Sequence, residues 1–233
     1  YGSMKPNTIG VRNSAFGYGV MVQNVSGSNN TAVGFQALYY NTTNNNSAFG
    51  YKALFANTTG YRNAAFGFAA LQNNTIGINN AAFGYQTLQT NTTGSNNTAV
   101  GLNSLFSNTI GQKNSAFGSQ ALFANTTGVN NSAFGTYALN ANTIGTQNVA
   151  VGHAALQNNT IGNNNTAVGI SALESNTTNN NNAFGYQALK ANTTGANNNA
   201  FGFRALYFNT IGSANGAFGN SSLRFNTKGN CNV

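Results

Sequence analysis

Acidic residues are almost missing from this sequence. Among its 233 residues there are nine Lys and Arg but a single acid, Glu174. One carboxylate excludes the paired acids of a glycosidase, and it cannot build the oxygen cage that calcium or magnesium requires. One His and one Cys also exclude a structural zinc site within one chain. The sequence therefore predicts a protein that is not an enzyme and that holds no cofactor or metal.

Long apolar runs are missing as well. No stretch reaches the roughly 18 apolar residues of a transmembrane helix, so no membrane insertion is expected. Residues 1–6 lack the apolar core of a signal peptide. The single Cys231 excludes a disulfide within the chain. The chain is nevertheless 40% apolar and 12% aromatic, which argues against disorder.

The main feature that is present is an internal repeat, marked by an Ala-Phe/Val-Gly triplet. Its glycines are spaced by 17 residues, except for two steps of 16 that end at Gly50 and Gly185. The thirteen glycines are Gly17, Gly34, Gly50, Gly67, Gly84, Gly101, Gly118, Gly135, Gly152, Gly169, Gly185, Gly202 and Gly219.

One repeat unit is numbered here from position 1 at Asn57 to position 17 at Asn73. Position 7 is Asn, position 9 Ala and position 11 Gly in every copy, whereas position 10 is Phe or Val and position 15 is Leu or Met. Both short units, at Thr43–Asn46 and Thr178–Asn181, lose one residue between positions 4 and 6. A segment that tolerates deletion is typical of a turn on the outside.

The residue types favour strands over helices. Most units contain two Gly, several Asn and a residue at position 3 that is mostly Thr or Ile, all poor helix formers. Short strands broken by Asn-Gly turns predict an all-β parallel β-solenoid of about 13 coils, one coil per unit. We expect a single repeat domain over 1–233, with a partial coil at 1–6, thirteen coils over 7–225 and a partial coil at 226–233.

Stacked coils would place position 7 of one coil over position 7 of the next. The Asn side chains would then form a ladder of hydrogen-bonded amides, as in cross-β structure. The predicted ladder residues are Asn13, Asn30, Asn46, Asn63, Asn80, Asn97, Asn114, Asn131, Asn148, Asn165, Asn181, Asn198 and Asn215.

The apolar recurrences at positions 3, 10 and 15 predict one inward residue on each side of a narrow coil. Phe66 and Leu71 are then plain core residues. Ala at position 9 and Gly at position 11 suggest a surface that another backbone approaches closely.

So thin a core predicts oligomerisation, because two or three apolar side chains do not offset the entropy of ordering a whole coil. The two partial coils match positions 12 to 17 and 1 to 8, so one chain's tail and another's head would nearly complete a coil. We expect head-to-tail assembly into an open filament. Alternatively, the chain is a fragment of a longer array. The end-to-end contact candidates are Tyr1, Met4, Asn226, Asn232 and Val233.

The motif Asn-Thr-Thr-Gly-x-x-Asn-Ser/Thr-Ala-Phe/Val-Gly-x-x-Ala-Leu resembles repeats of bacterial surface and phage tail-fibre proteins. It is also loosely similar to the head repeats of trimeric autotransporter adhesins, whose repeats are shorter. The resemblance covers nearly the whole chain, from Asn13–Gly17 onward. It implies a left-handed parallel β-roll and three chains in one fibre.

The remaining residues that could act in catalysis or binding are expected to be surface residues without such a role. His153 lies at position 12 and Glu174 at position 16, both variable, and Cys231 is expected to be a bystander thiol. Lys and Arg are scattered over positions 6, 13 and 16 without a dense stripe, which makes nucleic-acid binding unfavourable despite the net charge of +8. The charge would limit lateral clumping.

These features predict a non-enzymatic structural subunit of an extracellular fibre, on a cell or virion surface. One alternative is an adhesin or tail-fibre shaft that binds a surface glycan or receptor through Tyr39, Tyr51, Phe55 and Tyr85. Another is an ice-binding solenoid with a Thr row through Thr58, Thr75 and Thr92. Six Asn-Thr-Thr triplets also match the glycosylation acceptor pattern, and they begin at Asn41, Asn57, Asn91, Asn125, Asn176 and Asn192.

Overall fold

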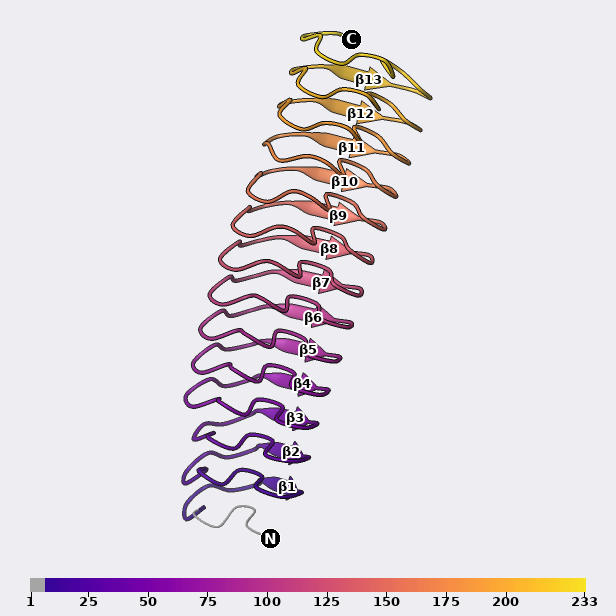
Figure 1. The fold of residues 1–233 in the computed structure, drawn as a ribbon. Coiled ribbons are helices and arrows are strands. Elements are labelled where there is room, and N and C mark those ends of the chain that lie inside the picture. Colours follow the sequence, from indigo (N-terminus) through magenta and orange to yellow (C-terminus); the bar gives the residue numbers. More distant parts are fainter. Residues whose placement is uncertain (1–6) are drawn as a thin grey trace. The chain divides into compact units, whose positions relative to one another are not determined.

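The computed structural model describes residues 7–233, so the end-contact candidates Tyr1 and Met4 lie outside the described residues. The chain forms two compact units, unit 1 to Asn114 and unit 2 from Ser115. Each unit is a parallel β-solenoid in which one repeat is one coil with one short strand (Figure 1). The predicted all-β solenoid fold is confirmed, and the described residues contain no helix.

The strands are three residues long and occupy positions 8 to 10 of each coil. Unit 1 contains β1 (Ser14–Phe16), β2 (Thr31–Val33), β3 (Ser47–Phe49), β4 (Ala64–Phe66), β5 (Ala81–Phe83) and β6 (Thr98–Val100). Unit 2 contains β7 (Ser115–Phe117), β8 (Ser132–Phe134), β9 (Val149–Val151), β10 (Thr166–Val168), β11 (Asn182–Phe184), β12 (Asn199–Phe201) and β13 (Gly216–Phe218).

Within each unit, consecutive strands pair in parallel and in register. Ala48 of β3 lies opposite Ala65 of β4, and Ala183 of β11 lies opposite Ala200 of β12. Equivalent repeat positions therefore stack directly along the solenoid, including across the 16-residue coils. This exact repetition of neighbours explains why single positions keep one residue type.

A chain of tight turns follows each strand. In the coil of β4, Ala70 N donates to Gly67 O, Gln72 N to Ala69 O and Asn74 N to Leu71 O, at 3.5, 3.3 and 3.1 Å. Ala69 and Leu71 have φ of 55° and 50°, as the third residue of a type II turn requires. The turns fold six residues into a compact corner, which is how 17 residues close a narrow coil.

Glycine at position 11 is required by two separate constraints. Gly118 has φ of 136°, a region that L side chains rarely adopt. A Cβ on Gly118 would also lie 2.7 Å from the carbonyl oxygen of Gly135 in the next coil. The predicted close backbone approach at position 11 is therefore confirmed, and the approaching backbone is the next coil's.

The apolar core is smaller than the sequence predicts. Leu71 and its equivalents at position 15 are fully buried from Met21 to Leu206, as expected, and so are the alanines at positions 9 and 14 from Ala32 onward. The predictions for positions 3 and 10 are wrong, since Ile76 is 52% exposed and the Phe66 series lies on the surface. A three-residue strand points its middle residue inward and its outer two outward, so Ala at position 9 occupies the interior and Phe at position 10 does not.

The predicted Asn ladder at position 7 is confirmed. Asn80 donates from N and from Nδ2 to Asn63 Oδ1, at 3.0 and 3.2 Å, and Nδ2 also donates to Gly94 O at 2.9 Å. From Asn30 to Asn215 these side chains are at most 1% exposed, whereas Asn13 is half-buried. Burial of so many amides is tolerated because each one is hydrogen-bonded.

A second Asn ladder, which was not among the predicted features, runs through position 1. Asn74 Nδ2 donates to Asn57 Oδ1 at 2.8 Å and to Gly77 O at 3.0 Å. The same Gly77 oxygen accepts from Asn63 Nδ2 of the position-7 ladder at 2.9 Å. The glycine carbonyl at position 4 therefore joins the two ladders. This second ladder could have been predicted, because position 1 is Asn in every unit.

The short units replace the missing residue without breaking either ladder. The Thr43 carbonyl accepts from Asn30 Nδ2 at 2.7 Å and from Asn41 Nδ2 at 2.8 Å, as the position-4 glycine carbonyl does elsewhere. Thr178 accepts in the same way from Asn165 and Asn176. The deletions thus fall in the outer turn, as predicted, and the buried hydrogen bonds set the limit on how much can be removed.

Candidate interaction surface

The residues considered for catalysis do not come together. His153 is exposed, and its ring lies perpendicular to that of Tyr137, with the ring centroids 6.0 Å apart. Cys231 is an exposed free thiol. Among residues 7–233 no group of three His, Cys, Asp or Glu could hold a metal ion, and no helix is long and apolar enough to cross a membrane. Among the described residues, aromatic side chains gather in rows on the outer surface instead.

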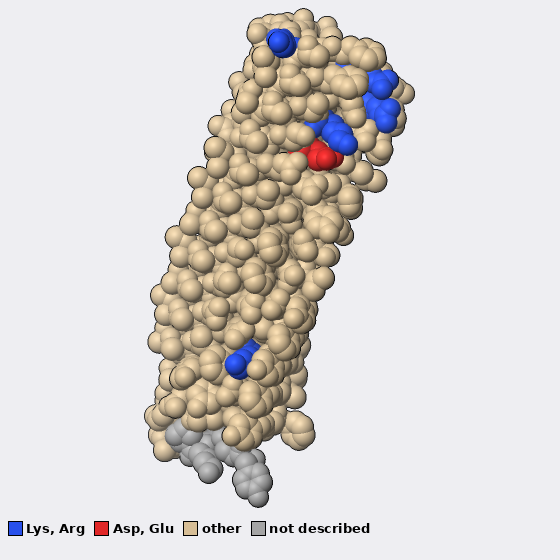
Figure 2. All heavy atoms as spheres, viewed as in Figure 1, with Lys and Arg blue, Asp and Glu red and all other residues tan. Residues whose placement is uncertain are grey.

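Glu174 departs from the expectation of a freely solvated acid. It is half-buried and lies 3.3 Å from Lys190 Nζ, one coil further along at the same repeat position. Figure 2 shows this acidic side chain beside a cation on unit 2. The pair removes Lys190 from the set of uncompensated cations.

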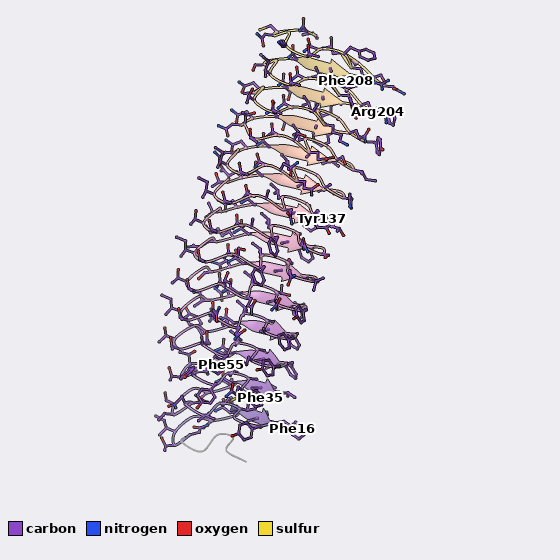
Figure 3. The ribbon with its side chains drawn as sticks, in the orientation of Figure 1. Phe16, Phe35, Phe55, Tyr137, Arg204 and Phe208 are labelled. Carbon is purple, nitrogen blue, oxygen red and sulfur yellow. The ribbon has the colours of Figure 1, made fainter. Side chains whose placement is uncertain are left out.

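Two rows of aromatic side chains run along the outer surface on either side of the position-11 glycines. The position-10 stripe follows the strand ends, and Phe49, Phe66 and Phe83 stack at 4.7 and 4.9 Å. The position-12 row of unit 1 contains Tyr18, Phe35, Tyr51, Phe68 and Tyr85, with neighbouring centroids 4.9 to 5.5 Å apart. Figure 3 shows Phe16 and Phe35, one from each row, on the outside of unit 1.

The rings in both rows stack face to face along the solenoid. Their planes differ by 7 to 11° in the position-12 row, so inner rings cover one another's faces and present edges to solvent. Such an edge-on apolar strip suits packing against another apolar surface. It is less suited to a sugar, which packs its C–H groups onto an open ring face.

A cluster of cations and aromatic rings lies on unit 2. Its residues come from positions 12, 13, 16 and 17 of three adjacent coils, where the repeat varies. The unit 2 cluster contains Tyr186, Phe203, Arg204, Tyr207, Phe208, Arg224 and Phe225. Figure 3 labels Arg204 and Phe208, which lie in the coil of β12 and its following turn.

A smaller cluster of the same layout occurs on unit 1. Lys52 Nζ lies 5.4 Å from the Tyr51 ring centroid and 5.3 Å from that of Phe55. Tyr39 and Tyr40 contact Phe55 at centroid distances of 5.4 and 5.2 Å. The structure therefore brings together three of the predicted glycan-contact residues, Tyr39, Tyr51 and Phe55, whereas Tyr85 lies two coils further along the position-12 row. The residues of both clusters lie at variable repeat positions. The positions that are identical in every copy therefore do not predict them.

The first short unit leaves a shallow depression on unit 1. It has a volume of about 320 Å³ and is lined by Thr43, Asn44, Asn45, Tyr61 and Arg62. The guanidinium of Arg62 lies 5.5 Å from the Tyr61 ring centroid. This hollow is open to solvent and follows from the residue missing in the turn.

The Thr row at position 2 serves the solenoid itself. Thr58 Oγ1 donates to Thr75 O, and Thr75 Oγ1 donates to Thr92 O, both at 3.1 Å. Each of these hydroxyl hydrogens is thus used between coils. The ice-binding interpretation stays a prediction, and this geometry adds nothing to it.

The Asn-Thr-Thr triplets are not accessible acceptors in the folded units. Their asparagines are the position-1 ladder residues and are 0% exposed. Asn57 Nδ2, for example, donates to Asn41 Oδ1 at 2.7 Å and to Gly60 O at 2.8 Å. A glycan on this nitrogen would break the ladder, so the match to the acceptor pattern follows from the repeat.

The fold defines the class of this protein as a β-solenoid with asparagine ladders. Comparisons with protein-family models, with curated proteins and with solved structures find no match.

Proposed function

We propose that this chain is a structural subunit of an extracellular fibre, in which copies stack head to tail and associate further through their apolar stripes. The observation that supports this most is that the coil of β13 carries the same hydrogen-bonding groups as the inner coils, so that a coil of a second copy can stack on it. An open strand edge is a template for pairing with another chain.

The groups of β13 repeat those that join the inner coils. Gly219 N donates to Phe201 O at 2.7 Å, so the corresponding Phe218 oxygen points away from β12. In the ladder, Asn215 Oδ1 accepts from N and Nδ2 of Asn232, at 3.0 and 2.9 Å. A coil of a second copy would meet the same donors and acceptors as an inner coil. A head-to-tail contact of this kind does not close and gives a filament. A longer array of the same repeat would cover this edge within one chain.

Asn226 and Val233, the other predicted end contacts, belong to the last turn of unit 2. Asn226 Nδ2 donates to Asn209 Oδ1 at 3.0 Å, which places it in the position-1 ladder, and Val233 is fully exposed. The position-10 stripe supports lateral association as well, since it repeats an apolar side chain in every coil of both units. Three copies around such a stripe would give the predicted trimer.

The experiment compares assembly of the full chain with that of two charged variants. Phe218→Lys with Asn220→Lys places two cations beside the open edge, and Phe134→Lys with Thr136→Lys places the same two cations on an inner coil. We expect filaments by negative-stain microscopy for the parent and the inner variant, and at least a tenfold loss of filament mass for the edge variant. Monomers for all three proteins at micromolar concentration would overturn the proposal, and so would equal assembly by the edge and inner variants.

A further inference from the structure

The unit 2 cluster contains two arginines that have no acidic partner. Glu174 is the only Asp or Glu of the chain, and it is paired with Lys190. The guanidinium carbons of Arg204 and Arg224 lie 5.5 and 5.9 Å from the same Tyr207 ring centroid. Two positive charges are therefore held around one ring, within the reach of a single small ligand.

Both guanidinium groups are oriented by their surroundings. Arg204 Nε donates to Gln187 Oε1 at 2.9 Å, and its guanidinium lies 5.1 Å from the Phe203 centroid. Arg224 lies 5.3 Å from the Phe225 centroid, and its Nε is shielded from solvent without a hydrogen-bond partner in the described structure. Guanidinium groups fixed in this way are suited to bidentate binding of a carboxylate or sulfate.

Apolar surface adjoins these donors. Phe203 is 46% exposed and is the last ring of its stack with Tyr186, because the next coil has Asn220 at the same repeat position. An open ring face next to a cation fits a ligand that combines C–H groups with an acid group. A sugar ring that carries a carboxylate or a sulfate has this chemistry.

We propose that the unit 2 cluster binds an acidic polysaccharide, with the acid groups on Arg204 and Arg224 and a sugar ring against Phe203. The proposal does not depend on fibre assembly. A polynucleotide fits less well, because it needs cations that continue along its phosphates. The neighbouring cation Lys190 is neutralised by Glu174, and the coil before it carries the uncharged Ser171 at the position equivalent to Arg204.

The test measures binding of oligosaccharides to the full chain by titration calorimetry at fixed low salt. The probes are hexagalacturonate, which carries carboxylates, its methyl ester as the neutral control, and dextran sulfate with dextran as its control. We expect the acidic member of at least one pair to bind, and its neutral partner to bind at least tenfold more weakly. The arm that binds identifies carboxylate or sulfate as the preferred acid.

Three double variants separate this site from general positive charge. Arg204→Gln with Arg224→Gln should raise the dissociation constant at least tenfold, and the two Lys substitutions should give an intermediate value because the planar fork is lost. Arg12→Gln with Arg62→Gln makes the same change in net charge on unit 1 and should alter binding less than twofold. Circular dichroism checks that each variant is folded.

Four outcomes would overturn the proposal. These are no binding of either acidic probe, equal binding of the neutral probes, equal loss in the unit 1 and unit 2 Gln variants, and tighter binding of a twelve-residue oligothymidylate than of both acidic oligosaccharides. The last outcome would assign the cluster to single-stranded nucleic acid.

Discussion

At the scale of the residue, the buried amides define this protein. Asn148 shows the full pattern, since it donates to Asn131 Oδ1 at 3.2 Å and to Gly162 O at 2.8 Å, and its own Oδ1 accepts from Asn165. Only Asn and Gln carry a side-chain amide, whose NH2 group donates and whose oxygen accepts two hydrogen bonds. Gln is one methylene longer and would not keep the same distances. The ladder therefore requires Asn itself, which explains why Asn occupies positions 1 and 7 in every unit.

Removing one ladder amide should be costly. Asn148→Ala should lower the free energy of unfolding by about 2–4 kcal/mol, because it leaves several buried groups without partners. Asn158→Ala, at an exposed position of the same coil, should change it by less than about 0.5 kcal/mol. Urea unfolding followed by circular dichroism measures both. Equal effects would show that the ladder adds no stability.

Two position-11 glycines allow the cost of backbone strain to be measured separately from the cost of a steric clash with the next coil. Gly118→Ala faces both an unfavourable φ and the carbonyl of Gly135, whereas Gly219→Ala has φ of 117° and nothing within 4 Å. We expect a loss of about 1–3 kcal/mol for Gly219→Ala, from strain alone. Gly118→Ala should lose about 1–3 kcal/mol more, from the contact. Thermal unfolding of the two variants tests this order, and a smaller loss at Gly118 would contradict it.

At the scale of the element, one coil is a three-residue strand and a set of turns around a core of methyl groups, one leucine and two amides. The repeat identities predicted the coil, its strand type and the position-7 ladder, because each depends on stacking like over like. They did not predict which apolar residue faces inward. Leu71 and Phe66 recur equally well, and only the strand's alternation, with Ala65 inward, places Phe66 outside.

This assignment makes a prediction about matched truncations. Leu139→Ala should cost about 2–5 kcal/mol, because it leaves a cavity in a fully buried site. Phe134→Ala removes a larger side chain from a surface stack and should cost about 1 kcal/mol, mainly the stacking with Phe117. Unfolding in urea distinguishes the two. A larger effect at Phe134 would restore the original expectation of Phe in the core.

At the scale of the whole molecule, the scarcity of acids has a structural meaning. Each repeat position becomes a row with neighbours about 4.8 Å apart, so a charge in a conserved position would stack on like charges. The one acid is tolerated because Lys190 follows it in the same row. The two cation–aromatic clusters could not be located from the sequence, since their residues come from different coils at variable positions.

The central claim is that copies of this chain stack end to end with the spacing of their own coils. Cryo-electron microscopy of the purified full chain tests it most directly. We predict filaments whose coils repeat axially at about 4.8 Å through the joints between copies, with the ladder continuing from Asn232 into the next chain. Discrete particles that contain one chain each, with β13 still uncovered, would contradict the account.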